Sequence, residues 1–397
     1  MFYIVNKFEG KGTLQAEPAS KGNGRPELGP KILFFSGGSA LRGVSQRLVR
    51  FTYNSVHIMT PFDSGGSSAV LRRAFAMPAI GDIRNRLMAL MDPSLPGCSA
   101  LLKLFAHRLP FDNTPSRLRA ELVRLVQGTH ALLAGLPPTL QSIVLRHLDI
   151  VYQSMPRGFD LAGASIGNLV LTGAYLENAH SLDAVIDLYS KLARVRGTVL
   201  PVVQGSYHLG ADLADGKRLV GQHLLTGKQA PPIGSPITSI FLTSDLTWQN
   251  PCQVQADVRV QSAISEAELI CYPMGSFFTS LLSNLLPRGI AESIHRARCA
   301  KVFVPSTFFD PECLGLSLQD QVRFLLRYAG HRPGARALNY ILVDPSLELY
   351  PGPVDMAALQ SMGVEVVMDR LVTWESSPAI DPDRLVRALF SLISGSR

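Results

Sequence analysis

Apolar residues recur along the chain in two patterns, short continuous runs and longer stretches with a helical period. The first run, Ile32 to Phe35, ends at Gly37-Gly38 and is followed by apolar residues at helical spacing from Leu41 to Val49. A second run, Val56 to Met59, also ends at a glycine-rich loop. Continuous apolar runs are typical of strands that are buried on both faces of a sheet. The pattern therefore predicts two buried strands, each followed by a glycine loop.

The rest of the chain alternates between helical and strand patterns. Helical spacing extends from Ile83 to about Met155, with breaks at prolines, and Asp215-Gly216 marks a hairpin within residues 207–225. Further helices are predicted over residues 165–178, 182–195, 276–298, 317–329, 354–361 and 381–394, and further strands over 198–203, 269–272, 302–304, 339–343 and 364–368. Strands that alternate with helices predict an α/β fold of Rossmann-like type, with a mostly parallel sheet covered by helices on both faces.

The chain has 397 residues, and its composition shifts near Lys31. Residues 1–30 contain several lysines, glycines and prolines, so we interpret them as a polar N-terminal extension. Residues 31–397 are predicted to form one α/β domain, with a helical insertion at about residues 92–156.

Composition excludes several classes of protein. The 46% hydrophobic residues exclude a disordered chain, and no apolar run approaches the roughly 20 residues of a membrane-spanning helix. The first residues have no basic region like that of a signal peptide. The five cysteines form no C-x-x-C pair, which argues against a disulfide framework or a zinc site. We therefore expect a cytoplasmic protein without a membrane segment.

The charge is basic, at +7, and comes from 29 arginines and only 9 lysines. Arginine suits bidentate contacts with phosphate and carboxylate groups, so the excess is compatible with an anionic ligand; a general compositional bias is the simpler reading. No run of five basic residues occurs, which argues against a nucleic-acid partner.

Three loops at predicted strand ends carry candidate chemistry. The first is Gly37-Gly38, and the second runs from Thr60 to Ser68, with Asp63 ahead of two glycines and three serines. The third begins at Gly275 and is rich in hydroxyl groups. Glycine loops before helices offer free backbone N–H groups to anions, although each is also compatible with an ordinary turn. Asp63 is a candidate cation ligand or the start of an Asx turn.

Two further motifs have simple structural readings. Asp82 in Gly81-Asp82-Ile83-Arg84 is predicted to be a helix N-cap, while Arg84 is a candidate partner for phosphate or for Asp63. The G-x-S-x-G pattern around Ser165 matches a nucleophile elbow, but no buried strand precedes it. A serine hydrolase is therefore a remote alternative.

The ordered set of motifs resembles the CofD-like family, which joins 2-phospho-L-lactate transferase to the bacterial gluconeogenesis-factor group. The resemblance extends from about Lys31 to the C-terminus. It is carried by the first loop and by the segments Thr60–Ser68, Gly81–Asn85, Gly163–Leu169, Ala193–Pro201, Gly275–Ile294 and Asp381–Leu385. The N-terminal extension and the altered first loop most resemble the CofD-like group that is encoded beside ATP-grasp and kinase-like proteins.

The resemblance implies a homo-oligomeric protein that binds a small phosphorylated nucleotide, of GDP/GTP type or a UDP-sugar, with Mg²⁺. Asp63 and Arg84 are the implied catalytic residues, and Asp63 is the implied metal ligand. The implied nucleotide- and phosphate-binding residues are Gly37, Gly38, Ser39, Ala40, Ser64, Gly65, Gly66, Ser67, Ser68, Asn85, Asn168, Arg196, Gly275, Ser276, Thr279 and Ser280.

Two departures from the family pattern fall on these loops. Ser64 stands where the family has a second adjacent aspartate, and Ser39-Ala40 stands where the family has a third glycine and a Thr-Gly pair. Two functions remain open at this point. One is transfer of a phosphorus-containing group from a nucleotide diphosphate-linked donor to a hydroxyl, as in 2-phospho-L-lactate transferase; the other is non-catalytic nucleotide-sugar sensing of the gluconeogenesis-factor type.

Overall fold

The architecture was obtained as a computed structural model, which describes residues 24–247, 250–332 and 336–395. Within these residues, seven strands form one parallel sheet in the order β10-β9-β8-β7-β1-β2-β3. The strands are β1 (Ile32–Ser36), β2 (Val56–Met59), β3 (Thr198–Pro201), β7 (Leu269–Tyr272), β8 (Ala300–Phe303), β9 (Tyr340–Val343) and β10 (Glu365–Met368). The predicted α/β fold with a Rossmann-like parallel sheet is confirmed.

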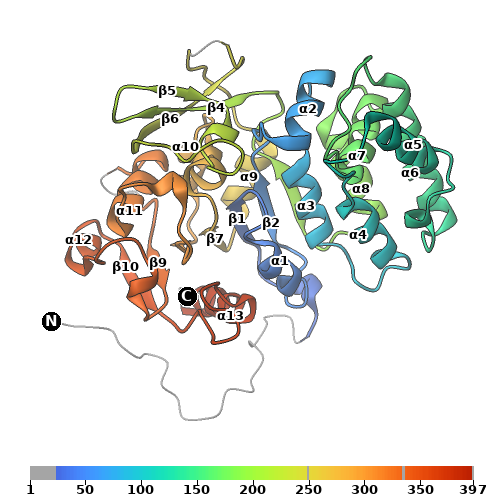
Figure 1. Cartoon of the computed structure of the whole chain (residues 1–397). Coiled ribbons are helices and arrows are strands. Elements are labelled where there is room, and N and C mark those ends of the chain that lie inside the picture. Colours follow the sequence, from blue (N-terminus) through green and yellow to red (C-terminus); the bar gives the residue numbers. More distant parts are fainter. Residues whose placement is uncertain (1–23, 248–249, 333–335, 396–397) are drawn as a thin grey trace.

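Helices surround this sheet (Figure 1). They are α1 (Arg42–Leu48), α2 (Gly66–Phe75), α3 (Gly81–Ala89), α4 (Cys98–Ala106), α5 (Pro115–Val126), α6 (Pro138–Ser154), α7 (Ile166–Glu177), α8 (Leu182–Leu192), α9 (Val258–Glu266), α10 (Ile290–Arg296), α11 (Leu318–Tyr328), α12 (Met356–Ser361) and α13 (Pro382–Gly395). Single turns occur at η1 (Pro26–Leu28), η2 (Ala131–Leu133), η3 (Gln222–Leu224), η5 (Leu282–Leu285), η6 (Pro311–Cys313) and η7 (Leu347–Leu349), and η4 (Phe277–Leu281) is a π-helical turn.

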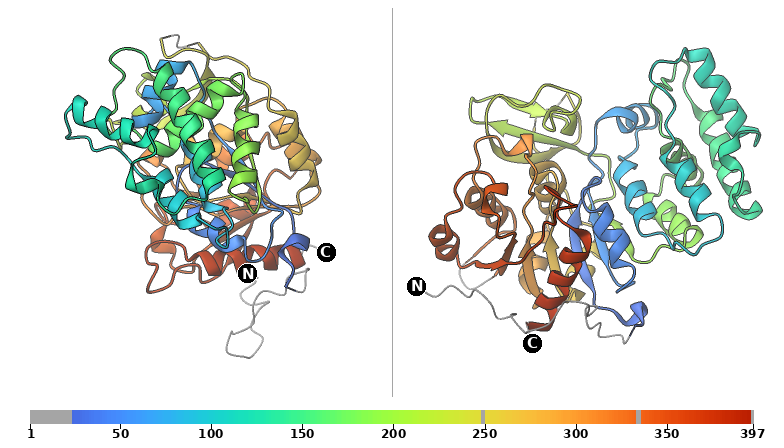
Figure 2. Two further views of the ribbon diagram at one scale, coloured as in Figure 1. Left: turned by 90° about the vertical axis from the view of Figure 1, so that its right-hand side faces the viewer. Right: turned by 60° about the horizontal axis from the view of Figure 1, so that its bottom comes forward.

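The two faces of the sheet are covered by different elements. Ile32 and Phe34 point from β1 into a core with α1 and α13, whereas Leu33 and Phe35 point into the opposite core. This alternation follows from the two-residue period of a strand, and it explains why the strand sequences are apolar throughout. In the right-hand view of Figure 2, the red helix α13 lies beside the blue elements that include α1.

Helices α3 to α8 surround a separate hydrophobic core beside β2 and β3. Helices α4 to α6 fall within residues 92–156, where a helical insertion is predicted. Figure 1 shows this helical layer as the green and teal part of the molecule. It reaches the sheet through α3 and α8, so its loops can contribute side chains to the end of β2.

A second sheet was only partly predicted. Strands β4 (His208–Leu213) and β5 (Arg218–Val220) form the predicted hairpin, and β6 (Ile237–Thr243) pairs with the other edge of β4. The sequence analysis missed β6, α2 and α9. It also predicted one helix over residues 276–298, which is wrong: Pro287 and Gly289 (φ +93°) separate α10 from the turns before it.

The described part of the extension packs against the domain. The Tyr53 backbone N–H donates to the Pro26 carbonyl, and the Thr52 hydroxyl donates to the Pro30 carbonyl, both at 2.8 Å. The packed domain therefore begins a few residues before Lys31. No helix in the described ranges combines the length and apolar character needed to cross a membrane.

Helices α6 and α7 pack so closely that they tolerate no side chain at Gly173. A Cβ added there would lie 1.9 Å from the carbonyl oxygen of His147. We expect Gly173→Ala to lower the free energy of unfolding by about 1–3 kcal/mol because the helices must move apart. Urea denaturation measures this change. Gly234→Ala is the control, since a Cβ there meets no atom within 4 Å; equal effects of the two substitutions would contradict this packing.

Candidate functional site

The first and third loops meet at the topological switch point of the sheet, where the strand order reverses between β1 and β7. Strands β2 and β3 lie on one side of β1, and β7 begins the other side, so the carboxyl ends of β1 and β7 are neighbours. A Cβ added to Gly37 would lie 2.9 Å from Ser280, and one added to Gly275 would lie 3.5 Å from the Cβ of Ala40. Open α/β sheets bind ligands at this kind of switch point.

The first loop leaves this point open toward solvent. Gly38 has a φ of +48°, and a Cβ added there would meet no atom within 4 Å. Ser39 and Ala40 are exposed, and the Arg42 backbone N–H donates to the Ser39 carbonyl to start α1. The loop therefore presents backbone to the space in front of the sheet, as the sequence predicts.

The second loop joins β2 to α2 and is fixed at several atoms. The Asp63 carboxylate accepts the Gly65 backbone N–H at 3.0 Å, so the Asx turn is present. A Cβ on Gly81 would lie 3.1 Å from Ser68 Oγ, 3.7 Å from Asn168 Nδ2 and 3.9 Å from Asp63 Oδ2. The lack of a side chain at Gly81 thus allows these three groups to converge. Ser67 joins them, because its Oγ accepts the Ser165 backbone N–H at 3.3 Å.

Asp82 is a site residue that the sequence analysis assigned wrongly. The N-cap of α3 is Ile80, and no side chain caps that helix. Asp82 instead accepts the Gly38 backbone N–H, which connects α3 to the first loop. Burial, followed by the charge of Asp63, raises the pKa of Asp82 to about 6. Asp63 and Asp82 therefore form a pair of neighbouring carboxylates between the first and second loops.

Three arginines gather beside this carboxylate pair. Arg84 is buried, and its guanidinium donates to Ser165 Oγ and, at 2.6 Å, to Asn85 Oδ1. Burial, the charge of Arg108 and more weakly that of Arg42 lower its pKa to about 10, against the opposing charge of Asp82. Like charges held together are stabilised by a bound anion, so this group of arginines is a candidate phosphate contact.

The small sheet closes over the second loop. Arg72 is buried and donates to the carbonyls of Phe62 and Asp63, both at 3.1 Å, and to the carbonyl of Tyr207 at 2.6 Å. The Ser64 hydroxyl lies 2.9 Å from His223 Nδ1, and the Gly66 backbone N–H donates to Gln229 at 2.9 Å. The departure at Ser64 therefore coincides with an imidazole contact that sequence spacing did not reveal.

The third loop differs from its predicted role. The Phe277 backbone N–H donates to Asp310 at 2.8 Å, and the backbone N–H groups of Phe278 and Thr279 donate to Glu312 at 3.0 and 2.9 Å. The Thr279 hydroxyl also donates to Glu312, at 2.5 Å. Internal carboxylates thus take the donors that the sequence assigned to phosphate, and Thr279 is fully buried. Gly275, Ser276 and Ser280 remain partly exposed beside the first loop.

Two predicted residues take structural positions. Arg196 precedes β3, at the amino end of the sheet, where its guanidinium pairs with Asp92 at 2.6 Å and lies 4.5 Å from the Tyr53 ring centre. The structure therefore does not bring Arg196 to the loops.

Ser165 has a structural role. Its side chain is fully buried, and its Oγ accepts hydrogen bonds from the Arg84 guanidinium and from the Asn168 backbone N–H, which caps α7. Within the described ranges, no histidine contacts Ser165. The hydrolase alternative receives no support from this geometry.

Buried polar atoms without partners lie at the same edge of the sheet. Within the described residues, Thr60 Oγ1, Asn168 Oδ1 and Asn284 Oδ1 have no hydrogen-bond partner. An unpaired buried polar atom costs about 1–3 kcal/mol, so such atoms are expected where a ligand or water completes them. They lie directly after β2, near the start of α7 and beside Ser36 at the end of β1.

The carboxylate pair fits a magnesium ion better than a metal held by protein alone. No group of three or more histidine, cysteine, aspartate or glutamate side chains with metal-binding geometry occurs in the described part of the chain. Magnesium is commonly held by one or two carboxylates together with substrate phosphates, and Asp63 and Asp82 offer that donor set. A cation there would also relieve the repulsion that raises the pKa of Asp82.

The strand order and the loops at the carboxyl ends define a Rossmann-like α/β protein. The chain belongs to the CofD family, because the family model described as "2-phospho-L-lactate transferase CofD" matches residues 32–372. The gluconeogenesis factor of Bacillus subtilis is 29% identical over 360 residues, covering 87% of this chain and 92% of that protein. A putative gluconeogenesis factor of Nostoc is 27% identical over 380 residues, covering 93% of this chain and 70% of that protein.

Solved structures agree on the fold. A UPF0052 family protein from Bacillus halodurans, solved at 2.60 Å, has a TM-score of 0.67 and 24% identity, and the match covers 91% of this chain and 98% of that chain. At this identity the likeness establishes the fold alone. The match of the family model over residues 32–372 confirms the sequence-based assignment to the CofD-like family.

The raised pKa of Asp82 makes stability depend on pH. A carboxyl whose pKa rises on folding stabilises the fold fully below its unfolded pKa of 3.8, and this contribution is lost as pH rises through about 6. The asparagine in Asp82→Asn does not ionise, so the variant does not lose this stability as the pH rises. We therefore expect the free energy of unfolding of the variant, relative to that of the native chain, to increase by on the order of 1–3 kcal/mol between pH 4 and pH 7.5.

Urea unfolding of both proteins across this pH range measures the effect. Asp187→Asn, on the exposed face of α8, is the matched control and should leave the pH dependence unchanged. A constant difference between Asp82→Asn and the native chain at all pH values would show that Asp82 is not a strained carboxyl.

Proposed function

We propose that this chain binds a nucleoside diphosphate group, with Mg²⁺, at the loops after β1 and β2 and transfers a phosphorus-containing group from it to a hydroxyl acceptor. The observation that carries the proposal is the meeting of the carboxylate pair, Asp63 and Asp82, with the arginines around Arg84 at the switch point of the sheet. The family name, 2-phospho-L-lactate transferase, supports the same class of reaction.

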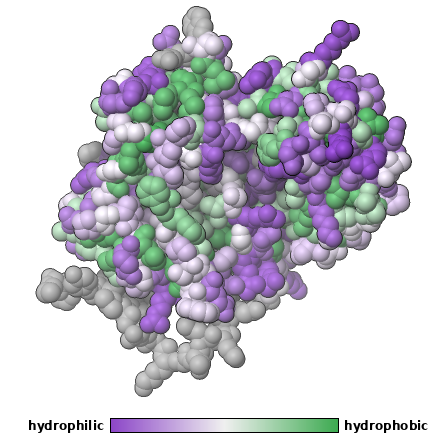
Figure 3. All heavy atoms as spheres, in the orientation of Figure 1, coloured by the Kyte–Doolittle hydropathy of each residue, from purple (hydrophilic) through white to green (hydrophobic). Residues whose placement is uncertain are grey.

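The charges of the site match the parts of such a ligand. The open backbone of the first loop and the exposed guanidinium groups of Arg42 and Arg108 offer donors to the diphosphate. Arg84 lies behind them, held by Ser165 and Asn85, so it contributes a fixed positive charge. Hydrophilic residues gather in the recess between the helical layer and the rest of the molecule (Figure 3).

Asp63 and Asp82 would hold Mg²⁺, which, when bound, supplies charge neutralisation for the diphosphate. In the transfer, the acceptor oxygen forms a bond to the outer phosphorus while the bond from that phosphorus to the bridging oxygen breaks, and a nucleoside monophosphate leaves. The acceptor proton passes to a site carboxylate. An oxygen of Asp63 or Asp82 that the metal does not hold is the candidate acceptor of this proton.

Calorimetric titration with GDP, UDP and a UDP-sugar, each with and without Mg²⁺, tests the binding claim. We expect micromolar binding that Mg²⁺ strengthens at least tenfold, and Asp63→Asn should remove most of that Mg²⁺ effect because one ligand oxygen is lost. Binding of a UDP-sugar without Mg²⁺ dependence or turnover would instead support a non-catalytic nucleotide-sugar sensor. Absence of binding by all three nucleotides would refute the proposal.

Arg108 tests the role of the arginines separately from the metal. Its side chain is exposed and belongs to the helical layer, where it donates to the Gly163 carbonyl at 3.1 Å. Loss of one charge-assisted hydrogen bond should weaken nucleotide binding by roughly 10- to 100-fold in Arg108→Gln. Arg117→Gln, at an exposed position of α5, should leave binding unchanged. Equal affinities of the two variants would contradict a phosphate contact at Arg108.

A further inference from the structure

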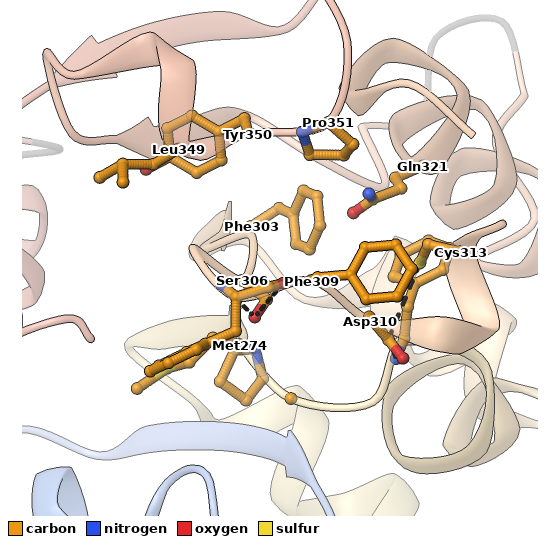
Figure 4. A pocket seen from close by; sticks show the side chains of 14 residues that line it. Met274, Phe303, Ser306, Phe309, Asp310, Cys313, Gln321, Leu349, Tyr350 and Pro351 are labelled. Carbon is orange, nitrogen blue, oxygen red and sulfur yellow. Dashed lines mark hydrogen bonds between the residues drawn. The ribbon is translucent and has the colours of Figure 1, made fainter. Parts of the chain in front are cut away.

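A pocket lies beside the switch point, at the carboxyl ends of β7, β8 and β9. Its volume is about 160 Å³. Figure 4 shows the side chains that surround it, which come from the segments that follow these three strands and from α11. The carboxylate pair and the arginines are not among the lining residues, so the pocket is distinct from the proposed phosphate and metal contacts.

Rigid aromatic rings form much of the pocket wall. Phe277 and Phe303 are buried, with ring centres 6.0 Å apart, and Tyr350 is buried with its hydroxyl accepting the Asp344 backbone N–H at 2.7 Å. Phe309 also lines the pocket, but 82% of its surface is exposed. A large apolar ring left in water at the rim of a pocket is typical of a surface that a ligand covers.

One buried amide in the pocket lacks a partner. Gln321 on α11 is only 6% exposed, and its side chain makes no hydrogen bond within the described residues. The other polar side chains of the wall are engaged: Asp310 accepts the backbone N–H groups of Phe277 and Glu312, and Ser306 accepts that of Phe308. The Gln321 side chain lines the pocket and its amide has no protein partner within the described residues, so its donor and acceptor groups point to a ligand with hydrogen-bonding groups.

The pocket connects directly to the first loop. Gly275 lines the pocket, and a Cβ on it would lie 3.5 Å from the Cβ of Ala40. Its φ of +141° suits glycine, so the wall between pocket and loop is bare backbone. A ligand with phosphates at the first loop can therefore extend past Gly275 into the aromatic pocket.

We infer that this pocket binds the base of the nucleotide, with the Gln321 amide hydrogen-bonded to the edge of the base and Phe309 covering its face. A nucleobase is planar, stacks on aromatic rings and carries donors and acceptors on its edge, which matches the wall and the unpaired amide together. A purely aliphatic group would leave Gln321 unpaired. The inference rests on the proposed nucleotide function and adds the residues that recognise the base.

The test compares a ligand that has a base with one that lacks it. Titrations with GDP, with UDP and with inorganic pyrophosphate, all with Mg²⁺, are made on the native chain and on two variants. Phe309→Ala should weaken binding of the nucleotide that the native chain prefers by roughly tenfold, because stacking on one ring is lost. Gln321→Leu should weaken the binding of this nucleotide by a similar factor, because the contacts of the amide are lost. Neither should change the affinity for pyrophosphate.

A stability measurement separates recognition from damage to the fold. Gln321→Leu replaces an unpaired buried amide by an apolar group of similar size, so its melting temperature should be equal to or above that of the native chain. Trp374→Ala and Gln360→Leu are controls at exposed positions that do not line the pocket, and they should leave nucleotide binding unchanged.

The possible failures are distinguishable. If the native chain binds no nucleotide, the proposed function fails, and the base pocket fails with it. If it binds nucleotide but Phe309→Ala and Gln321→Leu bind as the native chain does, only the base pocket is refuted. An equal loss of pyrophosphate and nucleotide affinity in the variants would also overturn the inference, because the pocket would then act on the phosphate site.

Discussion

The repulsion between buried like charges at one edge of the sheet is the constraint on which the candidate site depends. Asp82 is held near Asp63, and Arg84 near Arg108 and Arg42, while burial disfavours the charged forms of Asp82 and Arg84. Such an arrangement persists only because surrounding contacts fix it: Gly38 holds Asp82, Ser165 and Asn85 hold Arg84, and Arg72 holds the second loop. The fold thus keeps a set of charges that a metal and an anionic ligand would neutralise.

Three parts of the molecule contribute to this edge. The sheet supplies the loops, the helical layer supplies Arg108 and Asn168, and the small sheet with the segment after it supplies His223 and Gln229. The chain departs from its family at Ser64, and there the structure shows a contact with His223 in place of a second adjacent carboxylate. Asp82, which lies on α3 in the family segment Gly81–Asn85, still places a second carboxylate near Asp63, so the departure at Ser64 leaves two carboxylates for a cation.

The sequence was sufficient for the fold and for the loops at the strand ends, but not for the individual contacts between these loops. Buried strands such as Ile32–Ser36 are continuous apolar runs, and their glycine loops can be recognised without a structure. The role of Asp82 could not be predicted, because an aspartate near a helix start is usually a cap and its contact with Gly38 joins distant segments. In the same way, the third loop reads as a set of free donors until Glu312, which lies 33 residues beyond Thr279, is seen to occupy them. Arg196 falls within a family motif, yet the direction of β3 places it at the opposite end of the sheet from the loops.

The most direct test of the central claim is a crystal structure of the chain with a nucleoside diphosphate and Mn²⁺, with anomalous scattering used to locate the metal. The account predicts one anomalous peak within coordination distance of carboxylate oxygens of both Asp63 and Asp82, with diphosphate oxygens completing the shell against the first loop. A peak away from these two carboxylates, or a nucleotide bound without its phosphates at the carboxyl ends of β1 and β2, would contradict it.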